Sequence, residues 1–211
     1  MLHKTAIEPV TLELLIKLQQ TELLKDFSLA GGTSLAMQIG HRKSIDLDLF
    51  NQSDFEVNSV LEFLEQDFDF RMTYSSFNTL KGSINNIKID LISHKYPLVK
   101  KPINVQKACL YSVEDIAAMK LNAIAGNGTR SKDFIDIYFI LKKFSIEEIL
   151  SFYQKKYITR NLFHVIKSLN YFDDINMQDW PEMLIEKELT LSTVIKTIKS
   201  HLDNYSKQLN L

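Results

Sequence analysis

Residues 27–50 constrain the fold of this chain more than any other stretch. A short apolar run ends at two adjacent glycines, Gly31 and Gly32, which predicts a strand that enters a turn. A second strand follows and carries Asp46 and Asp48, which point to the same side because side chains alternate across a strand. We therefore expect a sheet with two carboxylates about 7 Å apart on one face, close to a turn that exposes backbone N–H groups.

A third carboxylate, Asp90, lies on another predicted strand with apolar neighbours on the opposite face. If this strand lies beside the first, Asp46, Asp48 and Asp90 converge and repel one another unless cations compensate. Two Mg²⁺ ions about 3.5–4 Å apart would do so and would also bridge the oxygens of a nucleoside triphosphate. The alternative is that Asp46 and Asp48 are solvent-facing residues of an edge strand.

The glycine pair and the residues after it resemble a phosphate site. Gly31 and Gly32 let the backbone approach a phosphate, and a helix predicted to begin at Thr33 or Ser34 offers a partial positive charge. Thr33 and Ser34 would add hydroxyl donors, and Arg42 is a fork-shaped partner for a phosphate or a carboxylate. The alternative is a plain tight turn in which one hydroxyl caps the helix. A P-loop is not supported, because the run G-x-x-x-x-G-K-[ST] is absent.

Further charged residues occur in the second half of the chain. Lys120 lies in the middle of an apolar helix, and Arg130, Asp133 and Asp136 open the next one. Lys120 and Arg130 either bind a triphosphate or form interhelical salt bridges with Asp133 and Asp136. The residues alone do not exclude either triphosphate binding or salt bridges, but they favour the salt bridges.

The order of elements predicts an α+β fold: a mixed-sheet core at 1–110 and a helical lobe at 111–211 that completes the active-site cleft. Capping patterns begin at Ser112 and Ser145, and Gly40 is expected to end a helix. Strands are predicted at 27–30, 44–50, 70–77 and 83–92, the last with a possible turn at 85–86, and helices at 11–24, 35–39, 56–68, 113–125, 131–143, after 145, 160–169 and 191–209.

Composition excludes several classes of protein. No apolar run is long enough to cross a bilayer, and no signal peptide is evident, so we expect no membrane association. The single cysteine, Cys109, fits the reducing cytoplasm. The net charge is −1, but residues 1–94 carry 8 basic and 13 acidic side chains and residues 95–211 carry 17 and 13. A basic half fits RNA, although solvated helix faces would give the same asymmetry.

Three sequence blocks are similar to the AbiEii/AbiGii-type nucleotidyltransferase toxins, relatives of the MenT toxins in the DNA-polymerase-β-like superfamily. The first joins Gly31-Gly-Thr-Ser-Leu-Ala to His41-Arg-Lys-Ser-Ile-Asp-Leu-Asp-Leu-Phe50, the second is Ile89-Asp-Leu91, and the third runs from Glu114 to Asp136. A weaker fourth block is Ser168-Leu-Asn-Tyr-Phe-Asp-Asp174.

The resemblance implies a nucleotidyltransferase that uses an NTP, with metal ligation by Asp46, Asp48 and Asp90 and with Lys120 and Asp136 in the active site. It also implies a toxin with a cognate antitoxin and an RNA acceptor, since some relatives act on the 3′ end of tRNA. Two alternatives remain: nucleotidylation of a protein hydroxyl, and a non-catalytic module that senses a nucleotide or binds a partner.

Overall fold

The computed structural model describes residues 2–208, and within them a seven-stranded mixed sheet is combined with eight α-helices. The predicted α+β class is therefore confirmed. The chain divides into two compact units: one runs up to Tyr96 and includes Lys101–Tyr111, and the other comprises Pro97–Lys100 and the chain from Ser112 onward. No helix within the described range is both long and apolar enough to span a membrane.

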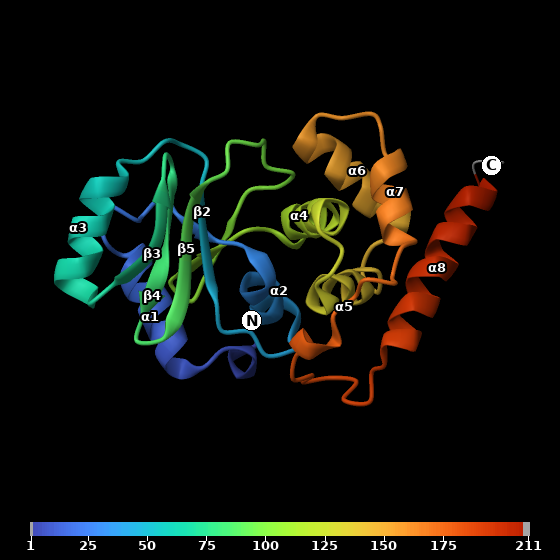
Figure 1. The fold of residues 1–211 in the computed structure, drawn as a ribbon, viewed down its shortest axis with the longest axis horizontal. Helices are drawn as coiled ribbons and strands as arrows, with labels where there is room; N and C mark the ends of the chain where they lie inside the picture. The colour runs from blue at the N-terminus through green and yellow to red at the C-terminus, as the bar shows by residue number, and fades with distance from the viewer. Residues whose placement is uncertain (1, 209–211) are drawn as a thin grey trace. The chain divides into compact units, whose positions relative to one another are not determined.

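All seven strands lie in the first unit, in the order β3-β4-β5-β2-β1-β7-β6. Figure 1 shows β3, β4, β5 and β2 side by side in this order. The elements are η1 Lys4–Ala6, α1 Pro9–Gln19, β1 Ser28–Leu29, α2 Gly31–Ile39, β2 Leu47–Asn51, α3 Val57–Phe68, β3 Arg71–Ser76, β4 Thr79–Ile84, β5 Ile87–Ser93, β6 Ile103–Val105 and β7 Ala108–Leu110.

One face of this sheet forms the apolar core. Leu47 and Leu49 of β2 and Ile89 and Leu91 of β5 are fully buried on that face, where they pack in one cluster with side chains of α1 and α3. The alternate residues of β2 are only half-buried. Alternation therefore leaves the second face of these central strands available for polar side chains.

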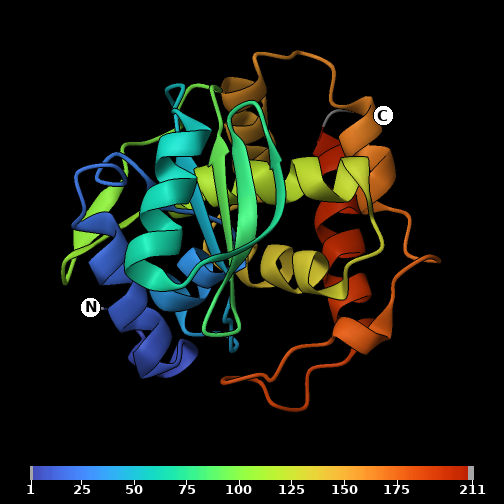
Figure 2. The same ribbon diagram turned by 60° about the vertical axis from the view of Figure 1, so that its left-hand side comes forward.

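The sequence located these elements better than it located their ends. The strand predicted at 83–92 is two strands, β4 and β5, joined at Asn85 and Asn86, both of which have positive φ. Asparagine tolerates this left-handed conformation, so the possible turn noted there is confirmed. The short strands β6 and β7 were not predicted. Gly40 ends α2 with φ of 68°, as expected. Figure 2 shows the β3–β4 hairpin, which contacts α3.

The second unit is helical, and each predicted helix is present. Its elements are α4 Val113–Gly126, α5 Ser131–Ile140, α6 Ile146–Tyr157, α7 Phe163–Leu169, η2 Met177–Asp179 and α8 Leu191–Gln208. The predicted end of the last helix at residue 209 lies outside the described residues. The capping box at Ser145 is complete, because Ser145 and Glu148 bond to each other's backbone N–H groups.

The second predicted capping box forms only half of its bonds. The Ser112 hydroxyl caps α4 by accepting a bond from the Asp115 N–H. The Asp115 carboxylate, however, does not accept a bond from the Ser112 N–H. It accepts bonds from the Val99 and Lys100 N–H groups at 3.0 Å and from the Ser112 hydroxyl at 2.8 Å, and it pairs with Lys156 at 2.8 Å. Asp115 thus binds the segment 97–100 to the helical unit.

Replacing Lys156 by Met should destabilise the protein by about 3 kcal/mol, because Lys156 and Asp115 are both fully buried and the carboxylate would lose its counter-charge. Denaturant unfolding measures this change. Lys143→Met is the control, since Lys143 is exposed and should stay within about 0.5 kcal/mol of wild type. Equal effects of the two substitutions would contradict this role.

Candidate active site

Asp48 of β2 and Asp90 of β5 are direct partners in a parallel pair of strands. Partner residues of neighbouring strands point to the same face and their backbones lie about 4.8 Å apart. The opposite face carries the buried leucine and isoleucine side chains of the core. The strand of the third predicted carboxylate is thus a direct neighbour of the strand that carries Asp48.

Asp46 is placed differently from the prediction. β2 begins at Leu47, so the alternation of a strand does not fix the direction of the Asp46 side chain. The Asp46 carbonyl accepts a bond of 2.5 Å from the Thr33 hydroxyl. Within residues 2–208, no three His, Cys, Asp or Glu side chains gather closely enough to hold a metal ion. The expected convergence of three carboxylates is therefore not present in this conformation.

Two lysines compensate the Asp90 charge instead. Lys81 of β4 and Lys88 of β5 approach Asp90 Oδ2 to 3.3 Å and 3.2 Å. Lys81 is the strand partner of Asp90, and Lys88 precedes it by two residues, so all three side chains share one face. Sequence reasoning missed both lysines, although the i, i+2 spacing of Lys88 and Asp90 was readable.

The second carboxylate oxygen of Asp90 has no such partner. Asp90 is 5% exposed, and its Oδ1 atom is buried without a hydrogen bond from any residue in the described range. A buried carboxylate oxygen in this state is unfavourable, so it marks a position where a cation or a hydrogen-bond donor would be favourable.

The N-terminus of α2 lies against the other carboxylate. Gly31 has φ of +63°, and a Cβ atom added to it would lie 2.1 Å from Asp48 Oδ2. No side chain caps α2 at its N-cap residue, Ala30. The first N–H groups of a helix, here beginning with Gly31 and Gly32, favour an anion such as phosphate. The predicted closeness of the glycines to a carboxylate is thus observed.

The hydroxyls of Thr33 and Ser34 serve the fold rather than an N-cap. The helix begins at Gly31, before the start predicted at Thr33 or Ser34, and both side chains are buried within it. Thr33 bonds to the Asp46 carbonyl and to the Ser44 hydroxyl, and the Ser34 hydroxyl donates to the Tyr111 carbonyl at 3.4 Å. Since these bonds occupy the hydroxyls, any phosphate contact here falls to backbone N–H groups.

The Arg42 side chain is also buried in the fold. It is 2% exposed and donates a bond of 3.0 Å to the Lys43 carbonyl. This burial leaves the guanidinium little surface for a triphosphate, and the phosphate contact of Arg42 stays a prediction. His41 beside it is fully buried.

In the helical unit, Lys120 of α4 lies between two carboxylates of α5. Its ammonium is 2.5 Å from Asp133 Oδ1 and 2.7 Å from Asp136 Oδ2, and all three residues are buried. This is the interhelical ion pair that the residues favoured. Asp133 Oδ2 is buried without a bond from any described residue. Arg130 is exposed at the N-cap position of α5.

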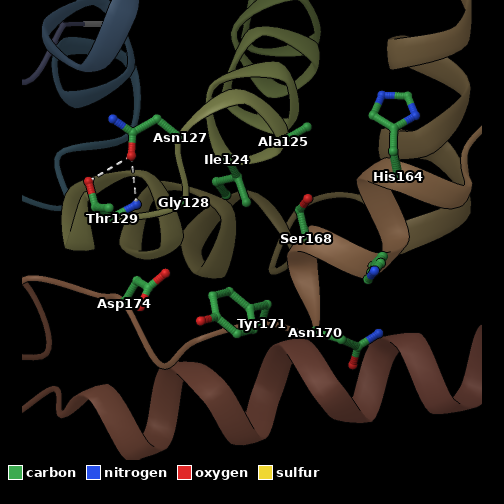
Figure 3. Close-up of a pocket in the computed structure, with 11 residues that line it drawn as sticks. Ile124, Ala125, Asn127, Gly128, Thr129, His164, Ser168, Asn170, Tyr171 and Asp174 are labelled. Atoms are coloured by element: carbon green, nitrogen blue, oxygen red, sulfur yellow. Dashed lines mark hydrogen bonds between the residues drawn. The ribbon is translucent and has the colours of Figure 1, made fainter.

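The helical unit also contains a pocket of about 790 Å³ (Figure 3). Ile124 and Ala125 of α4 line it together with Tyr171 and Asp174, which follow α7. A hydrogen bond to Asp174 raises the pKa of the Tyr171 hydroxyl. The pocket is lined by part of the weaker fourth sequence block, but Lys120, Asp133 and Asp136 do not line it.

A family model described as "Nucleotidyl transferase AbiEii toxin, Type IV TA system" matches residues 13–197. This chain belongs to the AbiEii nucleotidyltransferase toxin family. The resemblance stated from the sequence blocks is thereby confirmed, and the protein is an enzyme of the nucleotidyltransferase class. An uncharacterized protein of Aquifex aeolicus (strain VF5) is 30% identical over 198 residues, which cover 91% of this chain and 96% of the relative.

Solved structures agree on the fold. A proposed nucleotidyltransferase from H. pylori has a TM-score of 0.60 at 14% identity and covers 95% of this AbiEii-family chain and 94% of its own. JHP933 from Helicobacter pylori has a TM-score of 0.51 at 14% identity, and the match covers 97% of this chain and 98% of JHP933. The antibiotic-resistance factor ANT(2'')-Ia has a TM-score of 0.54 at 13% identity, and the match covers 68% of this chain and 88% of ANT(2'')-Ia.

Replacing Gly31 by Ala should lower nucleotidyl transfer at least about tenfold and destabilise the protein by about 1–2 kcal/mol. The new methyl group would displace the Asp48 carboxylate, and alanine disfavours a φ of +63°. Thermal unfolding and label transfer from an α-³²P NTP measure the two effects. Gly126→Ala is the control, because a Cβ there meets no atom within 4 Å and alanine favours the helix. If Gly31→Ala transfers nucleotide at the wild-type rate, the proposed importance of the close approach between Gly31 and the Asp48 carboxylate is wrong.

Proposed function

We propose that this AbiEii-family protein transfers a nucleoside monophosphate from an NTP to the 3′ end of an RNA, in a Mg²⁺-dependent reaction. The acceptor is a tRNA, the location is the cytoplasm, and a cognate antitoxin restrains the toxic activity. The observation that supports this proposal most is the alignment of Asp48 with Asp90 beside the N-terminus of α2.

The donor set at this place fits a magnesium ion. Carboxylate oxygens are the ligands that Mg²⁺ prefers, and Asp90 Oδ1 is buried without a partner among the described residues. Asp46 and Asp48 would hold the ion together with Asp90, once the half-buried Asp46 side chain turns toward them. The magnesium ion would neutralise charge on the triphosphate and on the transferred group.

The residues of the chain have separable roles in the transfer. The acceptor hydroxyl attacks the α-phosphorus, a new P–O bond forms, and the bond to pyrophosphate breaks. Asp90 orients the hydroxyl and takes its proton, a role for which a carboxylate on a rigid central strand is suited. The N–H groups of Gly31 and Gly32 bind phosphate oxygens. Lys120 and Asp136 are assigned to the active site by family resemblance alone.

Charge distribution is compatible with RNA as the acceptor. The part of the chain from residue 95 onward carries 17 basic and 13 acidic side chains, an excess of four positive charges. Positive surface attracts the phosphate backbone of RNA in a way that weakens with salt. A protein acceptor requires no such excess.

Replacing Asp48 by Asn should reduce transfer at least about a hundredfold while the protein stays folded, because the substitution keeps the size of the side chain and removes its charge. The assay incubates each α-³²P NTP with total tRNA or with total cell protein and measures the label in each fraction. Asp67→Asn, at an exposed acid on α3, is the control.

Label in the tRNA fraction that disappears with Asp48→Asn supports the proposal. Label in the protein fraction instead would show that the acceptor is a protein hydroxyl and not RNA. Unchanged transfer by Asp48→Asn would refute the active-site assignment.

Lys81→Met should tighten the binding of Mn²⁺ alone by about two- to fivefold, the range expected for loss of a partly exposed ion pair. Lys81 and the cation compete for the Asp90 carboxylate, so removal of the lysine favours the metal. Titration calorimetry measures the affinity. Lys25→Met is the control, because Lys25 pairs with a different carboxylate, Glu22. Unchanged or weaker Mn²⁺ binding by Lys81→Met would contradict the competition.

A further inference from the structure

Aromatic side chains continue from the carboxylate pair along the same face of the sheet. Phe50 follows Asp48 by two residues on β2, and its partner on β5 is Ile92, two residues after Asp90. Alternation places Phe50 on the face of Asp48 and Asp90, about 7 Å farther along the strand. Both β2 and β5 run in this direction, so the aromatic residues lie at the carboxyl ends of two parallel strands.

Three rings follow one another outward from the fold at this place. The Phe50 ring lies 5.3 Å from the His94 ring, and the His94 ring lies 4.9 Å from the Tyr96 ring, with interplanar angles of 39° and 53°. The ring of the buried Tyr111 lies 6.3 Å from the Phe50 ring in a T-shaped arrangement. Tyr96 is 46% exposed. We call Phe50, His94 and Tyr96 the aromatic platform.

Two hydrogen bonds hold the platform in place. The His94 N–H donates to the Asn51 carbonyl at 2.6 Å, and the Gln52 side chain donates to the Tyr96 carbonyl at 3.0 Å. These two bonds tie the segment after β5 to the last residue of β2 and to the residue that follows it. The rings are therefore positioned before any ligand arrives, which reduces the entropy lost on binding.

We propose that the aromatic platform binds the base of the donor nucleotide by stacking. This inference rests on the proposed function. A nucleotide whose phosphates lie at Asp48, Asp90 and the N-terminus of α2 has its base one sugar away, and the platform begins about 7 Å from these carboxylates. Every base presents a π-face, so stacking here accepts several bases and gives only modest selectivity among NTPs.

The test measures steady-state transfer with varied NTP and competition by inorganic tripolyphosphate, which has phosphates but no base. Tyr96→Ala should raise KM for the NTP about tenfold, the size expected for the loss of one stacked base, and should leave kcat within about twofold. Tyr96→Phe keeps the ring and should restore KM. Tripolyphosphate should inhibit wild type and Tyr96→Ala equally, because it does not reach the platform.

Tyr74→Ala is the matched control. Tyr74 is a tyrosine of similar exposure, 53%, on the edge strand β3 of the same unit. Three results would overturn the platform while the wild-type enzyme still transfers nucleotide. These are an unchanged KM for Tyr96→Ala, a raised KM that Tyr96→Phe does not restore, and an equal loss of tripolyphosphate binding in Tyr96→Ala. A wild-type protein that neither binds nor transfers any NTP would overturn the proposed function and the platform with it.

Discussion

The parallel pairing of β2 with β5 is the constraint on which the rest of the structure depends. One register places apolar residues such as Leu49 and Leu91 on the core face and aligns Asp48 with Asp90 on the other. Since side chains have a period of two along a strand, a slip of either strand by one residue would turn its carboxylate to the core face and its apolar residues away from the core. Burial of the apolar face therefore fixes the position of the acids, and fold stability and the geometry of the site have the same origin.

The two units compensate buried acids by the same physical means, pairing with lysine. In the sheet, Lys81 pairs with Asp90, which is 5% exposed. In the helical unit, Lys156 pairs with Asp115 where both are fully buried. The consequences differ, because Asp115 has its lone pairs occupied by several donors, whereas Asp90 keeps a buried oxygen with no partner among residues 2–208. A satisfied carboxylate suits a structural role, and an unsatisfied one is where added positive charge or a donor is favourable.

Local patterns predicted most of the elements, and tertiary contacts decided what those patterns missed. Apolar alternation located β2 and β5, and Gly40 marked the end of α2. The start of α2 at Gly31 depends on a left-handed residue packed against the Asp48 carboxylate, a contact between segments that propensity does not encode. Strands of three residues such as β6 have too few positions to show a period. The register of β4 brings Lys81 to Asp90, and a single sequence contains no direct signal for such a register.

The central claim is that Asp48 and Asp90 together hold a divalent cation at the N-terminus of α2, and crystallography with an anomalous scatterer tests it most directly. Crystals would be grown with Mn²⁺ and a non-hydrolysable NTP, with Asp48→Asn as the control. Data recorded near the manganese edge should give an anomalous peak within bonding distance of both carboxylates, with triphosphate oxygens against Gly31. This peak should be absent in the variant. Bound nucleotide with manganese elsewhere, or with Asp90 still paired to Lys81 and no peak beside it, would contradict the account.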